Sequence, residues 1–472
     1  MSRAPALSVI LACVAQALAQ SPVLIKLNVV ATDAKGAPVT DLRAADIQIR
    51  EDGKPQTAVF FRFAGSKGAL AQPAPDEFIN RPSPPPTLIL LDRWNEQEMT
   101  MVSAWQDVGA AVGHLEAVDR VYIYFLANRG ELVPVRALPG VETDLRAINQ
   151  PAPGELVAKL NDAVRTLSGL RDVANIDPVE RADKTLQALS IVSRMAVIAG
   201  PKNLIWVTHG FPLQVLDLTR QWRDYTGPLL ELCQIAARAQ VAIDTVDQSA
   251  QGAGADVGAL SRQTLELVAA QTGGRWYSSG RTNDAIAGVS TDARASYQLA
   301  YYAPVHAGGP RVHKIRVESA RKGIHLLTRQ AYFGDEAAPD PAETAEDAFT
   351  NESHSPFDAT EIALRVAMSR KPAALHLDIH VDPADVLIEH RGDRFHGSLI
   401  MKVALYRDGV FESAQAGIAQ DIDLTQEKYE SALKNGIVIP QDVVVNGQIQ
   451  QIRVMVFDRG GHGLGSVTIP IK

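Results

Sequence analysis

The spacing of apolar and polar residues changes along this 472-residue chain and divides it into β-rich and mixed segments. Residues 22–64 alternate apolar and polar side chains with a period of two, which predicts short strands joined by turns. Between residues 87 and 295, continuous apolar runs alternate with segments of helical spacing, and after residue 296 the period of two returns. The pattern therefore predicts an α/β segment between two β segments.

The most informative stretch is 84–96, in which prolines precede a short apolar run that stops at Asp92. Such a run is typical of a parallel strand covered on both faces by helices. Ligand sites in open α/β sheets lie just beyond the carboxyl ends of such strands. Asp92 is therefore the first residue for which we expect a function.

Further strands and helices follow this run in alternation, which predicts a doubly wound, mostly parallel sheet. The strands are expected at 121–126, 131–137, 202–210, 241–247 and 275–278. The helices are expected at 102–118, 154–167, 182–198, 219–240, 258–271 and 284–294.

The β segments on either side of the α/β segment are each too short to build a core. The second one has expected strands at 297–303, 313–319 and 324–333. We therefore expect the two segments to pair, so that the α/β domain is inserted in a single β-sandwich.

The remainder of the chain is predicted to form a second β unit behind a solvated linker. Residues 335–352 are acidic and nearly devoid of large apolar side chains, which is typical of a linker. A short helix is expected at 358–369, with Asp358 as its N-cap. Alternating strands between 375 and 471, separated by turn signals, indicate an immunoglobulin-like sandwich.

These patterns give a complete domain organisation. It comprises a signal peptide (1–20), an N-terminal β segment (21–70), a proline-rich linker (71–86), an α/β domain (87–295), a β segment completing the first sandwich (296–334), an acidic linker (335–355) and a C-terminal β-sandwich (356–472).

The first residues have the form of a secretory signal. Arg3 precedes an apolar stretch at 7–14 and a small-residue cleavage site at 17–19. The stretch is too short to span a membrane, so it predicts an exported protein that is periplasmic, envelope-associated or secreted. Two alternatives stay open: a buried N-terminal helix, and lipoprotein anchoring through Cys13.

Composition narrows the classes of function. The formal net charge is −8 and no long basic run is present, so nucleic acid is not an expected partner. Removal of the signal would leave Cys233 as the single cysteine, which excludes an intramolecular disulfide. Cys233 lies in an apolar helical pattern, where a cysteine is usually a small core residue.

Several stretches of the chain carry a family resemblance, namely residues 28–42, 51–56, 87–92, 200–206, 210–212, 272–275 and 297–303. Together they resemble the von Willebrand factor type A (VWFA)-related proteins of Acidobacteria. The resemblance covers roughly residues 22–334. It implies an exported protein with a type A-like α/β domain.

Type A domains often carry a metal-ion-dependent adhesion site. Its usual pattern is Asp-x-Ser-x-Ser after the first strand, a threonine in a middle loop and an aspartate after the fourth strand, around a divalent cation. Asp92 matches the first position, whereas Trp94 and Glu96 replace the serines. His209 stands where the last acidic ligand usually lies.

The middle-loop ligand is either Asp183 or Thr185, and the sequence does not decide between them. If Asp92, Glu96, Asp183 and His209 converge, they would form a remodelled site suited to a transition metal. The other interpretation is that the metal has been lost and that Asp92 and its neighbours cap chain ends.

No feature of the sequence requires catalysis. It contains neither a Gly-x-Ser-x-Gly elbow nor a phosphate-binding loop. We therefore expect a non-catalytic protein-interaction module without a cofactor, unless the remodelled site holds a divalent cation. The alternatives are a structural spacer in an envelope assembly and, third, a metal-dependent enzyme. Expected partner contacts at the strand ends are Trp94, Asn95, Thr208, His209 and Phe211.

Overall fold

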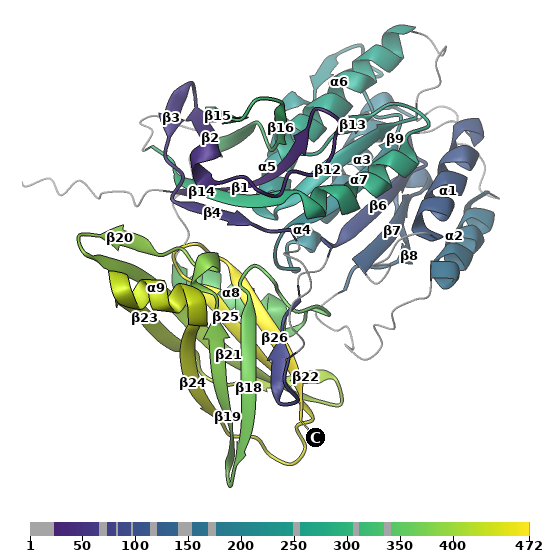
Figure 1. Cartoon of the computed structure of the whole chain (residues 1–472). Coiled ribbons are helices and arrows are strands. Elements are labelled where there is room, and N and C mark those ends of the chain that lie inside the picture. Colours follow the sequence, from purple (N-terminus) through teal and green to yellow (C-terminus); the bar gives the residue numbers. More distant parts are fainter. Residues whose placement is uncertain are drawn as a thin grey trace, which may run out of the picture.

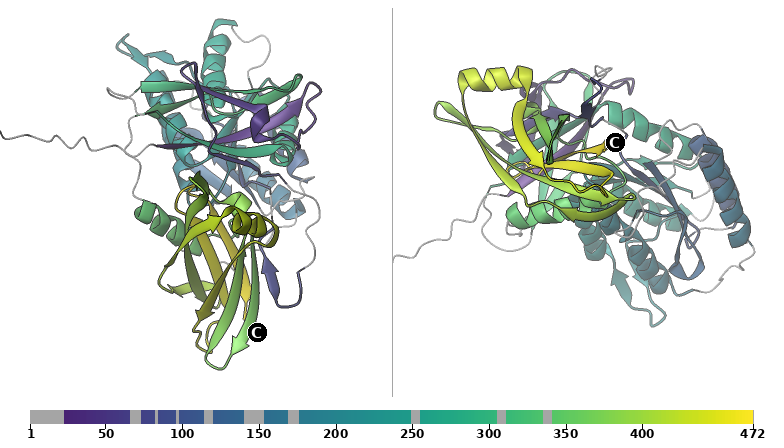
Figure 2. Two further views of the ribbon diagram at one scale, coloured as in Figure 1. Left: turned by 60° about the vertical axis from the view of Figure 1, so that its left-hand side comes forward. Right: turned by 90° about the horizontal axis from the view of Figure 1, so that it is seen from below.

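The computed structural model describes residues 23–65, 73–81, 84–95, 98–113, 120–139, 153–168, 176–248, 255–304, 311–334 and 341–471. The expected signal peptide, Cys13 and Glu96 lie outside these ranges. Within them, an α/β unit and a first β-sandwich lie side by side, and a C-terminal sandwich lies below both (Figure 1). Figure 2 shows the same arrangement from two other directions.

The α/β unit is built on a twisted six-stranded sheet in the order β13-β12-β9-β6-β7-β8. All neighbours are parallel except β7 and β8. The strands are β6 (Thr87–Asp92), β7 (Val121–Leu126), β8 (Leu132–Arg136), β9 (Lys202–Thr208), β12 (Val241–Asp247) and β13 (Trp276–Tyr277). Every residue of β6 is buried, as the apolar run predicts.

Alternate residues of β6 pack against opposite helical layers. Ile89 and Leu91 belong to a core shared with α1 (Glu98–Gly113), α2 (Pro153–Ser168) and α7 (Thr282–Arg294). Leu88 and Leu90 face a second core, which is formed with α3 (Pro178–Leu189), α4 (Ile191–Met195), α5 (Thr226–Arg238) and α6 (Ala255–Thr272). Helices on both faces of a mostly parallel sheet confirm the α/β class.

The first sandwich joins strands from both sides of the α/β unit. One sheet has the order β16-β1-β14-β4 and the other β17-β15-β2-β3. The strands are β1 (Leu24–Asp33), β2 (Ile47–Glu51), β3 (Lys54–Gln56), β4 (Phe60–Phe63), β14 (Ser296–Tyr302), β15 (Arg311–Ser319), β16 (Ile324–Leu327) and β17 (Ala331–Gly334). Apolar side chains of both sets of strands share one core, so the short segments do complete each other.

The C-terminal unit packs two antiparallel sheets around a common apolar core. One sheet contains β5 (Glu77–Ile79), β18 (Leu364–Lys371), β19 (Ala374–Val381) and β24 (Ile437–Val443). The other contains β20 (Glu389–Arg391), β21 (Arg394–Arg407), β22 (Val410–Ala414), β23 (Ile418–Thr425), β25 (Gln451–Asp458) and β26 (Leu464–Pro470). The α-helix α9 (Gln426–Asn435) connects β23 with β24.

The prediction of a solvated linker over residues 335–355 is wrong for its second half. Residues 341–353 form α8 (Pro341–Ser353), which buries Ala345 and Phe349 against β25 and its neighbours. These two side chains are four residues apart and therefore lie on one helix face. These two apolar side chains are enough to hold α8 on the sandwich because polar contacts hold it as well.

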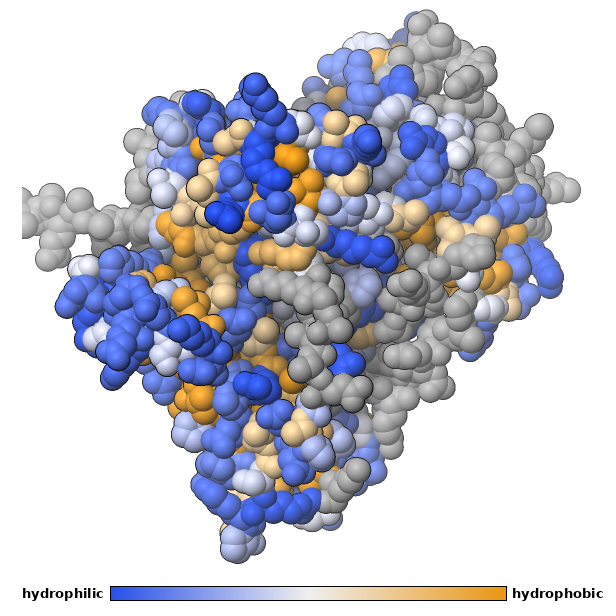
Figure 3. All heavy atoms as spheres, viewed as in Figure 1, coloured by the Kyte–Doolittle hydropathy of each residue, from blue (hydrophilic) through white to orange (hydrophobic). Residues whose placement is uncertain are grey.

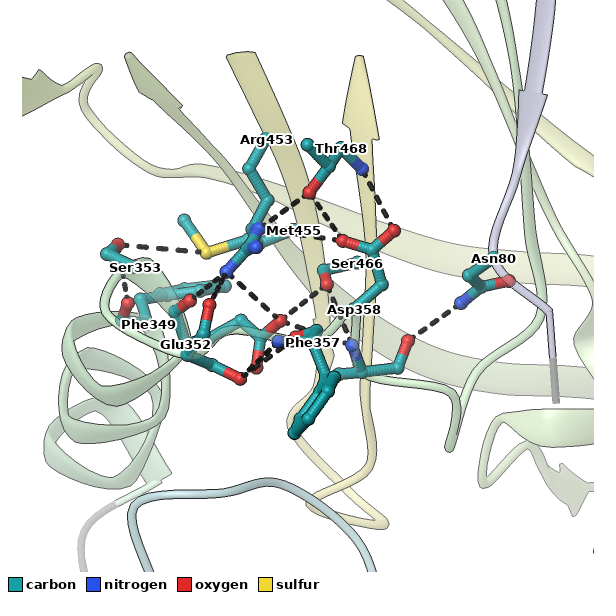
Figure 4. Close-up of polar contacts among 12 residues, drawn as sticks. Asn80, Phe349, Glu352, Ser353, Phe357, Asp358, Arg453, Met455, Ser466 and Thr468 are labelled. Carbon is teal, nitrogen blue, oxygen red and sulfur yellow. Dashed lines mark hydrogen bonds and ion pairs between the residues drawn. The ribbon is translucent and has the colours of Figure 1, made fainter. Parts of the chain in front are cut away.

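Those polar contacts are drawn in Figure 4. The buried guanidinium of Arg453 donates to the backbone carbonyls of Glu352 (2.5 Å) and Ser355 (2.8 Å). The Glu352 carboxylate accepts from the Ser466 hydroxyl at 2.5 Å and from the Ala359 N–H at 3.1 Å. The end of α8 is therefore fastened to β25 and β26.

Three further expectations are also wrong. The helix expected at 358–369 is largely the strand β18, because its residues alternate between the core and the solvent. The proline-rich linker is not merely a connection, since its residues 77–79 form β5 and pair with β18. The helix expected at 219–240 begins only at Thr226, after a hairpin of β10 (Gln214–Leu216) and β11 (Trp222–Asp224).

Among the described residues, short 3-10 segments lie at Ala44–Asp46, Asn128–Gly130 and Pro383–Asp385. On the face shown in Figure 3, hydrophilic residues predominate, and apolar residues gather where the C-terminal sandwich meets the rest of the molecule. Among the described helices, none combines the length and apolar character needed to cross a bilayer.

Candidate functional site

The end of β6 places Asp92 inside the α/β unit, with only 1% of its surface exposed. Its Oδ2 accepts hydrogen bonds from Thr208 Oγ1 (2.7 Å) and Trp206 Nε1 (3.1 Å), both on β9. Asn95 donates to the same carboxylate from its side chain (2.7 Å) and its backbone (3.0 Å). Burial raises the pKa of Asp92, and these donors oppose that shift.

The same network includes Thr185, one of the two expected middle-loop residues. Asn95 Nδ2 donates to Thr185 Oγ1 at 2.8 Å, and Thr185 in turn donates to the Arg181 carbonyl at 2.7 Å. Asn95 therefore bridges Asp92 and Thr185. Four hydrogen bonds onto the Asp92 carboxylate do what a cation would otherwise do, which is to compensate its burial.

Asp183, the other middle-loop residue, lies apart from this network. Its side chain is exposed on α3 and accepts a hydrogen bond from Tyr225 Oη at 2.7 Å. Among the described residues, Asp92, Asp183 and His209 do not gather closely enough to share one metal ion. These three groups therefore do not form the remodelled site that the sequence left open, and Glu96, its fourth candidate ligand, lies outside the described residues.

His209 lies half-buried just beyond β9. Burial lowers the pKa of His209, against the smaller opposing effects of a hydrogen bond with the Gln248 backbone and of the Asp247 carboxylate. The imidazole is thereby held in its neutral form at neutral pH. It is the one expected partner contact at the strand ends that keeps substantial exposure.

Trp94 is a core residue rather than a contact anchor, since only 4% of its surface is exposed. Its Nε1 donates to the Arg181 carbonyl at 3.1 Å, and the Arg181 guanidinium lies over the ring at 5.6 Å. Phe211 is equally buried and meets Tyr225 edge to face, at 5.8 Å between ring centroids. Both rings belong to the same hydrophobic core, so of the two roles that the sequence left open for them, core residue or partner contact, they have the first.

The exposed apolar side chains near the strand ends belong to the hairpin β10–β11. Leu218 is 80% exposed at its tip and Trp222 is 69% exposed on β11. Leu216 is directly opposite Trp222 across the hairpin and is also exposed. We call Leu216, Leu218 and Trp222 the hairpin tip.

The hairpin is rigid at both ends. In its turn, Asp217 Oδ1 accepts from the backbone N–H groups of Gln221 (2.8 Å) and Thr219 (2.9 Å), and these bonds lower the pKa of Asp217. At its base, Val215 is buried in the main core and the Tyr225 N–H donates to the Leu213 carbonyl at 2.8 Å. The hairpin tip is therefore presented on a fixed support.

Sequence reasoning missed this hairpin because β11 was included in the helix expected at 219–240, and no strand was expected at 214–216. The signal that could have revealed it is the alternation of residues 214–216 together with Asp217, whose side chain favours a turn.

No protein-family model and no curated protein match the chain. Among solved structures, it is similar to an aerotolerance-related membrane protein from Bacteroides fragilis, with 9% identity and a TM-score of 0.26, covering 44% of this chain and 97% of that one. It is also similar to the pilus adhesin SpaC from Lactobacillus rhamnosus GG, with 10% identity and a TM-score of 0.30, covering 90% of this chain and 56% of that one. For the human COPII-coat protein Sec24c, the identity is 9% and the TM-score 0.26, and 53% of this chain and 44% of that one are covered. Scores at this level carry no inference about function.

Proposed function

We propose that this chain is an exported, non-catalytic protein-interaction module that binds a protein partner through the hairpin tip. The observation that carries the proposal is the exposure of Leu216, Leu218 and Trp222 on a hairpin whose turn and base are both fixed. Tryptophan is among the residues most enriched in binding hot spots, and Trp222 is the central residue of this surface. A rigid hairpin also loses little conformational entropy when it binds.

We further propose that the α/β unit is a type A-like domain inserted in the first sandwich and that the C-terminal unit is immunoglobulin-like. The parallel sheet with helices on both faces and the pairing of β1 with β14 support the first assignment. The two antiparallel sheets around one core support the second. Export rests on the form of residues 1–20.

In this proposal the strand-end site works without a metal ion. Asp92, Asn95, Thr185 and Thr208 are already joined by hydrogen bonds, and Asp183 is engaged by Tyr225. Titration of the full chain with Mg²⁺ tests this point. Magnesium binding that is lost in Asp92→Asn would contradict it.

The partner surface is tested by placing a photo-crosslinking amino acid at position 218, with a matched probe at Leu433. Leu433 is also an exposed leucine, but it lies on α9 in the C-terminal sandwich. On irradiation in an envelope extract, the probe at 218 should form a discrete adduct with a protein and the probe at 433 should not. Equal labelling from both positions, or none from 218, would favour the alternative function, a structural spacer in an envelope assembly.

The identified partner then allows an affinity measurement. Trp222→Ala should weaken binding by roughly 2 kcal/mol, about thirtyfold, which is the usual size of an aromatic hot spot. Leu433→Ala is the control. Because the Trp222 side chain is largely exposed, its loss should leave the melting temperature unchanged.

A further inference from the structure

Two carboxylates and an imidazole meet at one end of the first sandwich. Glu51 is the last residue of β2, Asp52 follows it in the turn to β3, and His313 lies on β15. Strand pairing brings them together, because Glu51 is opposite Ile315 in the β2–β15 ladder. Each residue offers one ligand atom, and these atoms all lie within 4.8 Å of one another.

Two of the three side chains are held in place by the core. Glu51 is 1% exposed and His313 is 4% exposed. Tyr332 donates a hydrogen bond to Glu51 Oε1 at 2.9 Å, and its ring stacks on the His313 ring at 5.2 Å. Opposite the imidazole is Gly334, where an added Cβ would come within 2.7 Å of His313 Cδ2. The positions of the carboxylate and the imidazole are therefore fixed before any ligand arrives.

Asp52 connects this cluster with the solvent. Its side chain is 42% exposed, and its Oδ2 lies 2.7 Å from His313 Nδ1. Its Oδ1 accepts from the Lys314 N–H at 2.9 Å, which orients the carboxylate. An ion could therefore enter from the turn without opening the sandwich.

The donor atoms of the cluster indicate which class of cation it would bind. A buried carboxylate is stable only when it is compensated by hydrogen bonds, by a proton on a neighbour or by a metal ion. Two carboxylates and one imidazole form a mixed oxygen and nitrogen donor set, which suits Zn²⁺, Mn²⁺ or Fe²⁺ better than Mg²⁺. We propose that Glu51, Asp52 and His313 bind one divalent transition-metal ion, which cross-links the β2–β3 turn to β15.

The proposal is independent of the hairpin and of the strand-end site, and its test uses the full chain stripped of metals. Calorimetric titration with Zn²⁺, and separately with Mn²⁺, should show one saturable site in the wild type. Asp52→Asn should weaken Zn²⁺ binding by about 100-fold. Loss of a residue that only hydrogen-bonds to a metal ligand already costs about 10–100-fold in affinity, and Asp52 is proposed as a ligand itself. This variant should fold, because Asp52 is exposed and has φ +48°, which asparagine tolerates.

Two further variants distinguish this site from others on the chain. Glu51→Gln removes a buried ligand and should abolish binding. His325→Gln removes an exposed histidine of the same sandwich and should leave binding unchanged. Saturating Zn²⁺ should also raise the melting temperature of the wild type but not that of Asp52→Asn.

The proposal would be overturned if the wild type bound neither ion. It would also be overturned if Zn²⁺ bound equally well to the wild type, Glu51→Gln and Asp52→Asn. Loss of partner binding in hairpin variants, by contrast, would leave the metal titration unchanged.

Discussion

At the residue scale, the Asp92 carboxylate is buried and compensated by donors from β9 and from the turn after β6. If the Asp92 carboxylate were removed, these buried donors would have no acceptor. The side chain therefore acts as an acceptor that holds three segments of chain together, and its removal should be felt as a loss of stability.

Asp92→Ala should lower the free energy of unfolding by about 3–5 kcal/mol, because several buried donors would each lose their acceptor at about 1–3 kcal/mol. Urea denaturation of the two proteins measures the difference. Asp183→Ala is the control, since Asp183 is exposed on α3. Equal effects of the two substitutions would contradict a structural role for Asp92.

Glu352 gives a second test at this scale, through pH. Burial raises the pKa of Glu352 to about 7, against the opposing effect of Arg453. The folded state then binds the proton more tightly than the unfolded state, so stability should fall as pH rises from about 4.5 to about 7. The whole fall amounts to about 3 kcal/mol.

Glu352→Gln should remove this fall while keeping an acceptor for Ser466. Denaturation midpoints of both proteins between pH 5 and 8 measure the difference. Burial also raises the pKa of Asp244 to about 7. Asp244 therefore makes its own contribution to the loss of stability with rising pH, and the variant keeps that contribution. Glu346→Gln, on the exposed side of α8, is the matched control. A variant with the wild-type pH profile would contradict the assignment.

At the element scale, α8 shows how little apolar surface a helix needs when its end is fastened. Phe349 is fully buried and meets Phe457 of β25 at 6.1 Å between ring centroids. Glu346 and Asp347, on the other side of the helix, are exposed. One aromatic side chain therefore carries most of the apolar contact of the helix.

Phe349→Ala should destabilise the protein by about 3–5 kcal/mol, the usual cost of deleting a buried phenylalanine. Proteolysis between residues 335 and 355 should accelerate, because the helix would lose its anchor. Leu433→Ala on α9 is the control, since Leu433 is exposed. Proteolysis of α8 at the wild-type rate would contradict its dependence on Phe349.

An element could be predicted from the sequence when many of its residues follow one periodicity of apolar side chains. The apolar runs of β6 and β7 are buried over their whole length, and periodicity reveals such strands directly. The pairing of β1 with β14 was predictable because neither β segment could form a core alone. By contrast, α8 depends on Ala345 and Phe349 within an acidic segment, too weak a pattern to distinguish from a linker.

The candidate site was less predictable than the fold. Position alone identified Asp92, but the identity of its partners depends on which rotamers and turns the surrounding chain adopts. Trp94 is compatible with a core residue or a surface anchor, and only packing against Arg181 decides between them. The hairpin tip was missed because a three-residue strand carries too few alternating residues to be recognised, and β11 was included in the helix expected at 219–240.

At the scale of the whole molecule, buried polar contacts join the two sandwiches. Arg62 of β4 forms an ion pair with Asp385 of the C-terminal sandwich at 3.2 Å and donates to the Glu361 carbonyl. Lys26 of β1 donates to the His462 carbonyl at 2.7 Å. These contacts fix the C-terminal sandwich to the first one.

Arg62→Ala should cost about 3–5 kcal/mol, because it leaves the Asp385 carboxylate buried without its cation. The two sandwiches should also become free to move, which small-angle X-ray scattering would show as a larger radius of gyration. Arg321→Ala breaks an exposed pair with Asp41 and should have little effect on stability, because water screens such a pair. Unchanged scattering in Arg62→Ala would show that the pair does not hold the units together.

The strand β5 has a consequence for the order of events during synthesis. Asn80, directly after β5, accepts a hydrogen bond from the Leu364 N–H, 284 residues further along the chain. At about 5–20 residues per second, β5 leaves the ribosome roughly 15–60 seconds before the strand it completes. For that interval its edge has no partner. A three-residue strand near prolines exposes few backbone groups to non-native strand pairing. Its shortness therefore limits aggregation of the nascent chain until β18 has been synthesised.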